Sequence, residues 1–208
     1  MSLLPSSVTL NTHTFGALAR PSECASLFAL GRSDRLELRQ PILALSVLNG
    51  YAALGLQDGS VCMCSLSPLR VLFDFEAHPG YPASAVHLVS PSQLLTGGGD
   101  GTVCLWRLDE DGDSDRRRAT FEGHQGPVVC LYGDGEKVVS GARDGTVRVW
   151  EAETAKVRFE LRGFTAYLGS LRVSPQWLIA DGTNNAVLKL DFTEEAILAQ
   201  ADEDDDED

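Results

Sequence analysis

One thirteen-residue segment occurs twice in this chain, at a spacing of 44 residues. The first copy, LLTGGGDGTVCLW, begins at Leu94, and the second, VVSGARDGTVRVW, begins at Val138. In both copies an Asp-Gly pair precedes an alternating run that ends in tryptophan. A catalytic motif has no reason to recur at a fixed spacing, whereas a structural repeat does. The chain is therefore predicted to consist of repeated units of about forty residues.

Weaker copies of the segment extend the repeat towards both ends of the chain. LGLQDGSVCMC places Asp58 in the register of the other two aspartates, with Cys64 where the tryptophan would stand. IADGTNNAVLKL is a more divergent copy near the C-terminus, and RLELRQ in the N-terminal part mirrors RFELRG at residues 158–163. The units that result are predicted at residues 1–40, 41–79, 80–123, 124–163 and 164–201.

Each unit contains four short runs with the pattern of β-strands. In the fourth unit these runs are PVVCLY, KVVSGA, TVRVWEA and VRFELRG, which are rich in valine, alternate in polarity and are separated by turn residues. Alternation with a period of two residues is typical of strands and not of helices. The Asp-Gly pairs tolerate the positive φ angles that a tight hairpin turn requires. The pattern predicts an all-β fold, a β-propeller of about five four-stranded antiparallel blades.

Units three and four also resemble the WD-repeat family. The motif residues are His124, Ser140, Asp144 and Trp150 in unit four, and His78, Thr96, Asp100 and Trp106 in unit three. The family's Gly-His step is present as Gly123-His124, whereas Ala77 replaces the glycine in unit three. The resemblance implies that these side chains form a hydrogen-bond chain inside each blade. That role suits them physically, because a buried indole N–H, imidazole or carboxylate must be hydrogen-bonded.

The other units depart from this motif, and their number is small for the family. Ala17, Leu54 and Ala180 stand at the hydroxyl position in units one, two and five. The resemblance implies seven blades in most members, and a propeller avoids exposed sheet edges by closing its ring. Three hypotheses follow: a tight five-bladed ring, a ring completed by a partner or a second copy of the chain, or a fragment of a longer propeller. We favour the incomplete ring.

Composition excludes several other classes of protein. Of the net charge of −13, seven charges lie in Asp202–Asp208, which is predicted to be a disordered acidic tail at residues 202–208. The rest of the chain lacks the basic stripe that direct binding of nucleic acid requires. No run of about eighteen apolar residues occurs, so no membrane-spanning helix is expected. The five cysteines follow no secretory signal and include no C-x-x-C pair. We therefore expect free thiols, no metal site, and an intracellular location in the cytoplasm or nucleus.

Function is predicted to be non-catalytic. Nucleophile-elbow, phosphate-loop and zinc-protease motifs are absent, so no enzyme activity and no cofactor are expected. The resemblance implies a scaffold that binds other proteins or peptides on the rim where loops emerge from the blades. The expected rim residues are Gln57, Tyr81, Gly99, Gln125, Arg143, Phe164 and Tyr167. Two alternatives are the substrate receptor of a ubiquitin ligase, for which no adaptor-binding helical module precedes residue 40, and an acidic-tail chaperone for basic proteins.

Overall fold

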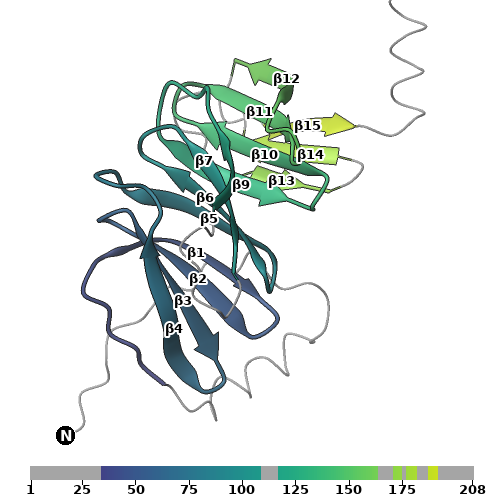
Figure 1. The fold of residues 1–208 in the computed structure, drawn as a ribbon. Coiled ribbons are helices and arrows are strands. Elements are labelled where there is room, and N and C mark those ends of the chain that lie inside the picture. Colours follow the sequence, from purple (N-terminus) through teal and green to yellow (C-terminus); the bar gives the residue numbers. More distant parts are fainter. Residues whose placement is uncertain (1–33, 109–116, 164–170, 175–176, 182–186, 192–208) are drawn as a thin grey trace, which may run out of the picture. The chain divides into compact units, whose positions relative to one another are not determined.

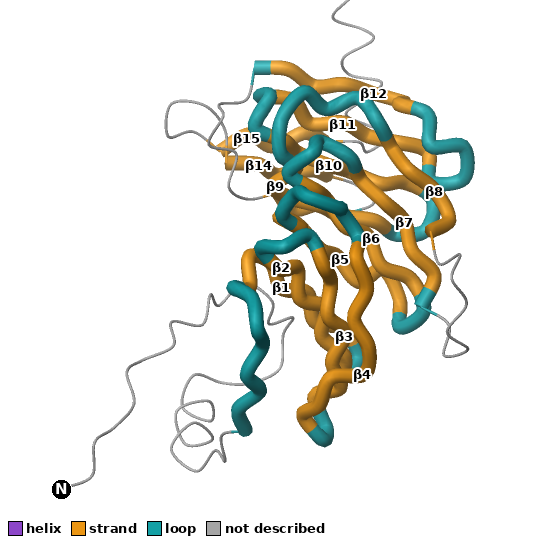
Figure 2. Tube along the Cα trace, turned by 60° about the vertical axis from the view of Figure 1, so that its left-hand side comes forward, coloured by secondary structure: helices purple, strands orange, loops and turns teal. Residues whose placement is uncertain are grey.

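The regular structure of the chain consists of β-strands. The structure is a computed structural model, and it describes residues 34–108, 117–163, 171–174, 177–181 and 187–191. All fifteen described strands lie within residues 36–208, one of the two units into which the chain divides. Figure 2 shows these strands in orange. No helix in the described part of the chain is long and apolar enough to cross a membrane.

The strands form separate antiparallel sheets in which neighbours in sequence are neighbours in space (Figure 1). The first sheet contains β1 (Ile42–Leu48), β2 (Tyr51–Leu56), β3 (Ser60–Leu66) and β4 (Leu69–Glu76). The second contains β5 (Ala83–Ser90), β6 (Gln93–Gly98), β7 (Val103–Arg107) and β8 (Arg117–Phe121). The third contains β9 (Val128–Gly133), β10 (Lys137–Ala142), β11 (Thr146–Glu151) and β12 (Val157–Arg162). The fourth contains β13 (Leu171–Val173), β14 (Trp177–Asp181) and β15 (Val187–Asp191). We refer to the β1–β4, β5–β8 and β9–β12 blades and to the β13–β15 sheet.

The same turn joins the second and third strands of each of the three blades. Its aspartate accepts a hydrogen bond from the backbone N–H two residues later, at 2.9–3.0 Å. The following glycines, Gly59, Gly101 and Gly145, have φ angles of 89°, 81° and 78°. Residues with a Cβ rarely adopt such angles. The repeated Asp-Gly pair is therefore the local cause of these hairpins.

The apolar core lies between successive blades. The first strands of the sheets, β1, β5, β9 and β13, contact one another in chain order. One core cluster joins the β1–β4 and β5–β8 blades and includes Trp106, whose ring lies 4.8 Å from that of Phe75 on β4. A second joins the β5–β8 and β9–β12 blades and includes Trp150, whose ring lies 5.7 Å from that of Phe121 on β8. Each tryptophan thus packs against the last strand of the preceding blade.

The predicted all-β propeller of four-stranded antiparallel blades is confirmed. Several sequence predictions fall on residues outside the described ranges. These are most of the first predicted unit, with Ala17, and the acidic segment at 202–208. The cysteines within the described ranges are free thiols, and Cys62, Cys64 and Cys104 are buried while Cys130 is partly buried.

Candidate functional site: the loop rim and the polar networks beneath it

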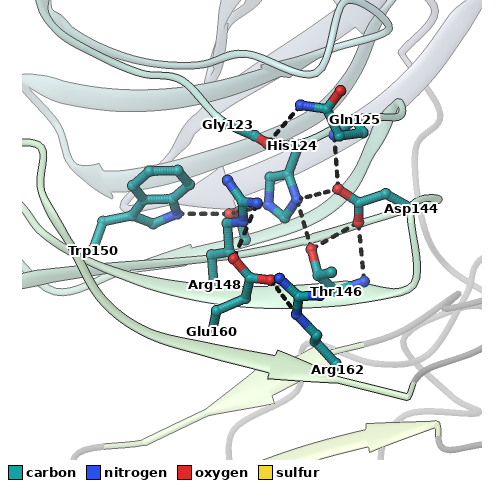
Figure 3. A network of polar contacts seen from close by, with 10 residues as sticks. Gly123, His124, Gln125, Asp144, Thr146, Arg148, Trp150, Glu160 and Arg162 are labelled. Carbon is teal, nitrogen blue, oxygen red and sulfur yellow. Dashed lines mark hydrogen bonds and ion pairs between the residues drawn. The ribbon is translucent and has the colours of Figure 1, made fainter.

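A polar network links two strands, the turn between them and the incoming connection in the β9–β12 blade (Figure 3). Trp150 donates its indole N–H to the Ser140 hydroxyl at 2.8 Å, and that hydroxyl lies 2.7 Å from His124 Nε2. His124 Nδ1 lies 3.0 Å from an Asp144 carboxylate oxygen. Because the serine oxygen accepts from the indole, its own proton is free to go to Nε2. The Nδ1–H tautomer of His124 then donates to Asp144.

The β5–β8 blade contains the same arrangement in a looser form. Trp106 donates to the Thr96 hydroxyl at 2.8 Å, and this hydroxyl lies 2.9 Å from His78 Nε2. The contact between His78 Nδ1 and the Asp100 carboxylate is longer, at 3.4 Å. In the β9–β12 blade the turn aspartate also accepts the backbone N–H of Gln125 at 2.8 Å. The β9–β12 network is therefore the tighter of the two.

Two threonines complete these networks, and the sequence motif did not include them. Thr146 Oγ1 lies 3.0 Å from His124 Nδ1 and donates to Asp144 at 2.7 Å. Thr102 has the same position in the other blade, at 3.2 Å from the imidazole, and donates to Asp100 at 2.9 Å. The signal for both was present, because each strong copy of the repeat reads Asp-Gly-Thr. A short hydroxyl at this step reaches back over the hairpin turn.

Burial and hydrogen bonding together determine the charge states within these networks. It lowers the pKa values of His124 and His78 below the ordinary value, although a carboxylate faces each imidazole. Burial acts against ionisation of Asp144 as well, but hydrogen bonds from the Gln125 N–H, the Thr146 hydroxyl and His124 hold its pKa below the usual range. The networks thus contain neutral imidazoles and an ionised Asp144 near pH 7.

Thermal stability is expected to fall as the pH drops below the ordinary histidine pKa of 6.5. The pKa of His87 is also lowered, chiefly by burial. The unfolded chain binds protons at all three histidines near pH 6.5, whereas the folded chain does not, so protonation favours unfolding. Both states are neutral above about pH 7.5, where stability should be independent of these groups. Melting temperatures recorded from pH 8 to pH 5 at constant ionic strength test this. A flat or rising profile below pH 6.5 would contradict it.

The β1–β4 blade replaces the network with apolar side chains. Its sequence matches that of the β9–β12 blade at a constant offset of 86 residues, which relates Asp58 to Asp144. At this offset Leu38, Leu54 and Cys64 occupy the positions of the histidine, serine and tryptophan. These three pack together with Leu36, Leu56 and Cys62. Leu54 stands at the hydroxyl position of the β1–β4 blade, and Ala180 stands at that position in the β13–β15 sheet. Both residues are buried in apolar clusters.

The loops above these networks form a continuous rim within each blade. The backbone N–H that precedes each turn aspartate donates to a proline carbonyl in the connection leading into the same blade. These bonds join Gln57 to Pro41 at 3.0 Å, Gly99 to Pro82 at 2.8 Å and Arg143 to Pro127 at 2.9 Å. The Asp-Gly turn and the incoming connection are thus fixed to each other in all three blades.

The rim also continues from one blade to the next. The backbone N–H of His78 donates to the Gly59 carbonyl at 3.0 Å, which ties the turn of the β1–β4 blade to the next connection. Gly101 approaches the following connection so closely that an added Cβ would lie 2.7 Å from the His124 carbonyl oxygen. Since each connection is also bonded to its own turn, loops from three blades form one linked surface.

Most of the described rim residues named from the sequence present their side chains to solvent. Gln57, Gln125 and Arg143 are exposed, and Tyr81 is 52% exposed despite its aromatic ring. Gly99 is partly buried against Pro82. Phe164 and Tyr167 lie outside the described residues. In the part of the chain that the structure describes, no cluster of three or more metal-ligating side chains occurs.

The four-stranded antiparallel blades repeat along the chain, and two of them contain a polar network and a tryptophan that packs on the preceding blade. These features define a repeat protein of the β-propeller class. The model of the WD40 family, described as "WD domain, G-beta repeat", matches residues 67–107 and 116–151. The chain therefore carries WD40 repeats at these two positions, as the sequence resemblance predicted.

Similar proteins support this assignment. The ribosome biogenesis protein YTM1 of Kluyveromyces lactis is 32% identical over 118 residues, 52% of this chain and 26% of that protein. Pre-mRNA-processing factor 17 of Saccharomyces cerevisiae is 29% identical over 129 residues, 60% of this chain and 28% of that protein. The chain thus spans about a quarter of the length of these relatives. The crystal structure of the computationally designed Ika4 protein matches with a TM-score of 0.67 and 22% identity, covering 78% of this chain and 99% of that one. That likeness concerns the fold alone.

Proposed function

We propose that this protein is a non-catalytic scaffold that binds other proteins or peptides on its loop rim as a subunit of a larger complex. The observation that carries the proposal is the linked rim, in which turns and connections of three blades are hydrogen-bonded or in close contact. A surface held in this way loses little conformational entropy when a partner binds. An intracellular location accords with the free thiols within the described ranges.

The composition of the rim suits protein recognition. Tyr81 offers a large, half-exposed aromatic surface beside the β5–β8 blade, and Arg143 offers a planar cation on the next blade, β9–β12. Tyrosine and arginine are enriched among the residues that contribute most to binding energy at interfaces. The Asp144 side chain bonds the backbone of Gln125 and so connects the exposed rim to the buried network. The polar networks are positioning elements in this proposal and have no chemical step to perform.

The relatives support a role within assemblies. Their names refer to ribosome biogenesis and to pre-mRNA processing. Because this chain matches only part of each relative, we carry over the general role of a protein-binding subunit and no particular partner.

A rim variant tests the proposal against a matched control. The triple variant Tyr81→Ser, Gln125→Ala, Arg143→Ala removes three exposed side chains from the rim. The control, Glu136→Ala, Glu153→Ala, Lys156→Ala, removes three polar side chains from the β9–β10 and β11–β12 turns. We expect the amount of co-purifying protein to be at least about tenfold lower for the rim variant than for the wild type. The control should retain them, and both should melt within a few degrees of the wild type. If the rim variant keeps the same co-purifying proteins, the rim is not the binding surface.

A further inference from the structure

One side of the β1–β4 blade exposes large apolar side chains. Three residues of β1 are 52%, 59% and 48% exposed there, and they are Ile42, Leu45 and Val47. Their partners on β2 are Leu56, Leu54 and Ala52, which all belong to one buried apolar cluster. Residues directly opposite each other in an antiparallel pair point to the same side, so the exposed side chains border this cluster. We call this side of the blade the β1 face.

The same side of the next blade is covered. The strand registers relate Val47 on β1 to Leu88 on β5. Leu88 is 4% exposed and belongs to the core cluster that joins its blade to the β1–β4 blade. No residue of β5 or β9, two strands that the structure describes in full, is as exposed as these residues of β1. The exposure at the β1 face is therefore not a general property of first strands.

A short segment before β1 covers part of the β1 face. Leu36 and Leu38 pack there on the buried cluster. They belong to RLELRQ, which matches RFELRG on β12 and relates Leu38 to Leu161. Leu161 lies on the last strand of its blade and packs in the cluster shared with the β13–β15 sheet. The Leu36–Leu38 segment thus lies on the β1–β4 blade as a last strand lies on the blade that follows. No other strand of such a preceding blade occurs in the described ranges.

The β13–β15 sheet has an exposed side as well. Ala180 on β14 is buried against the β9–β12 blade. Its neighbour Asp181 is opposite Val187 on β15, so Val187 points to the other side of the sheet. Val187 is 75% exposed. The same side carries Lys189, whose charge is paired with Asp191 at 2.8 Å. We call this side of the sheet the β15 face.

Within the chain, surfaces equivalent to these two faces pack on each other. Val187 has the position that Val61 has on β3 and Val103 has on β7. Those two valines are fully buried in the clusters that join their blades to the following blades. Their partners, Phe75 and Phe121, pack there on the tryptophans of the following blades. The β15 face and the β1 face are therefore the two halves of a contact that the chain already makes between its own blades.

Two copies of the chain supply enough sheets for one ring. The structure describes four sheets, so two copies contain eight, and propellers have four to eight blades. The crystal structure of the computationally designed Ika8 protein matches this fold with a TM-score of 0.61 and 24% identity, covering 73% of this chain and 46% of that one. The fold of this chain thus corresponds to about half of that designed propeller. A single copy leaves both faces uncovered, since Leu45 and Val187 are exposed.

We propose that a second copy of this chain covers the β1 face, with the β15 face of its β13–β15 sheet packed on Ile42, Leu45 and Val47. The sheet lies beside the Leu36–Leu38 segment as the first three strands of a blade lie beside the last. A twofold axis makes the same contact at the other end, which closes the ring and removes both apolar patches from water. No side chain of the rim takes part, so this proposal holds or fails independently of the proposed function.

The mass of the purified full-length chain in solution tests the proposal. By light scattering coupled to size-exclusion chromatography we expect twice the chain mass of 22.4 kDa from about 1 to 100 µM. A monomer throughout this range would overturn the proposal, and it would mean that another part of the same chain or another protein covers the β1 face. Masses above two copies would overturn it too, because they would show that the ring does not close.

Charged substitutions on the two faces locate the contact. Leu45→Glu and Val187→Lys should each raise the dissociation constant of the dimer at least about tenfold, because each buries a charge against apolar side chains. Val157→Glu is the control, since it places the same charge at an exposed apolar position on β12 and should leave the dimer unchanged. If Leu45→Glu weakens the dimer and Val187→Lys does not, the two β1 faces contact each other and the proposed partner surface is wrong.

A mixture of the two variants provides a test that does not depend on either variant alone. Pairing a Leu45→Glu chain with a Val187→Lys chain restores one wild-type contact and sets opposite charges against each other in the second. With one variant fluorescently labelled, we expect association at least about tenfold tighter than that of either variant with itself. Equal association would overturn the proposal. The rim triple variant should form the wild-type dimer, which separates this contact from partner binding at the rim.

Discussion

Replacing Trp150 with alanine is expected to lower the free energy of unfolding by about 3–5 kcal/mol. The indole is 1% exposed, packs on Phe121 of the preceding blade and donates its N–H to Ser140. The substitution therefore leaves a large cavity between two blades and also removes the hydrogen bond that orients the serine hydroxyl towards His124. Urea unfolding followed by circular dichroism measures the loss.

Cys64 provides a matched control for Trp150, because it occupies the same position in the β1–β4 blade. Cys64→Ala removes only a sulfur atom from an apolar cluster and should cost about 1 kcal/mol. A Trp150→Ala protein within about 1 kcal/mol of the wild type would mean that the indole and its network do not hold the blades together.

Replacing Gly59 with alanine is expected to lower the free energy of unfolding by about 2–5 kcal/mol, because two costs coincide at this residue. Its φ angle of 89° is unfavourable for any residue with a Cβ. The added methyl group would also collide with the backbone carbonyl oxygens of His78 and Tyr81, which cannot move without displacing the next connection. The substitution should thus destabilise the protein and disturb the rim around Tyr81.

Gly50→Ala separates these two costs. Gly50 has a similar φ of 81°, but an added Cβ would meet no atom within 4 Å. We expect this control to cost only the backbone strain of about 1–2 kcal/mol. The difference between the two variants, measured by urea unfolding, gives the cost of the close approach between the turn and the connection. Equal losses would show that the close approach contributes nothing to stability.

Part of the site could be read from the sequence because its members recur in register. His124, Ser140, Asp144 and Trp150 stand out since His78, Thr96, Asp100 and Trp106 repeat them, and the structure places each set in one hydrogen-bonded group. The threonines that follow the Asp-Gly pairs were overlooked, although they recur just as regularly. A hydroxyl after a turn carries no distinctive signal until its distance to the imidazole is known.

The ion pair between Arg148 and Glu160 could not be found from the sequence. The two residues read there as ordinary charges on separate strands. They meet at 3.1 Å only because β11 pairs with β12 in the register that sets Arg148 opposite Glu160.

The sequence by itself determined the strand period, the Asp-Gly hairpins, the repeat length and the class of fold. These are local properties, because side-chain alternation and positive φ angles depend on residues close together in the chain. Only the tertiary structure decided which residues share a surface: which connection packs on which turn, which tryptophan packs on which phenylalanine, and which carboxylate pairs with Arg148. Such neighbours are set by strand register and by the packing of one blade on the next, and these act between residues that are distant in sequence.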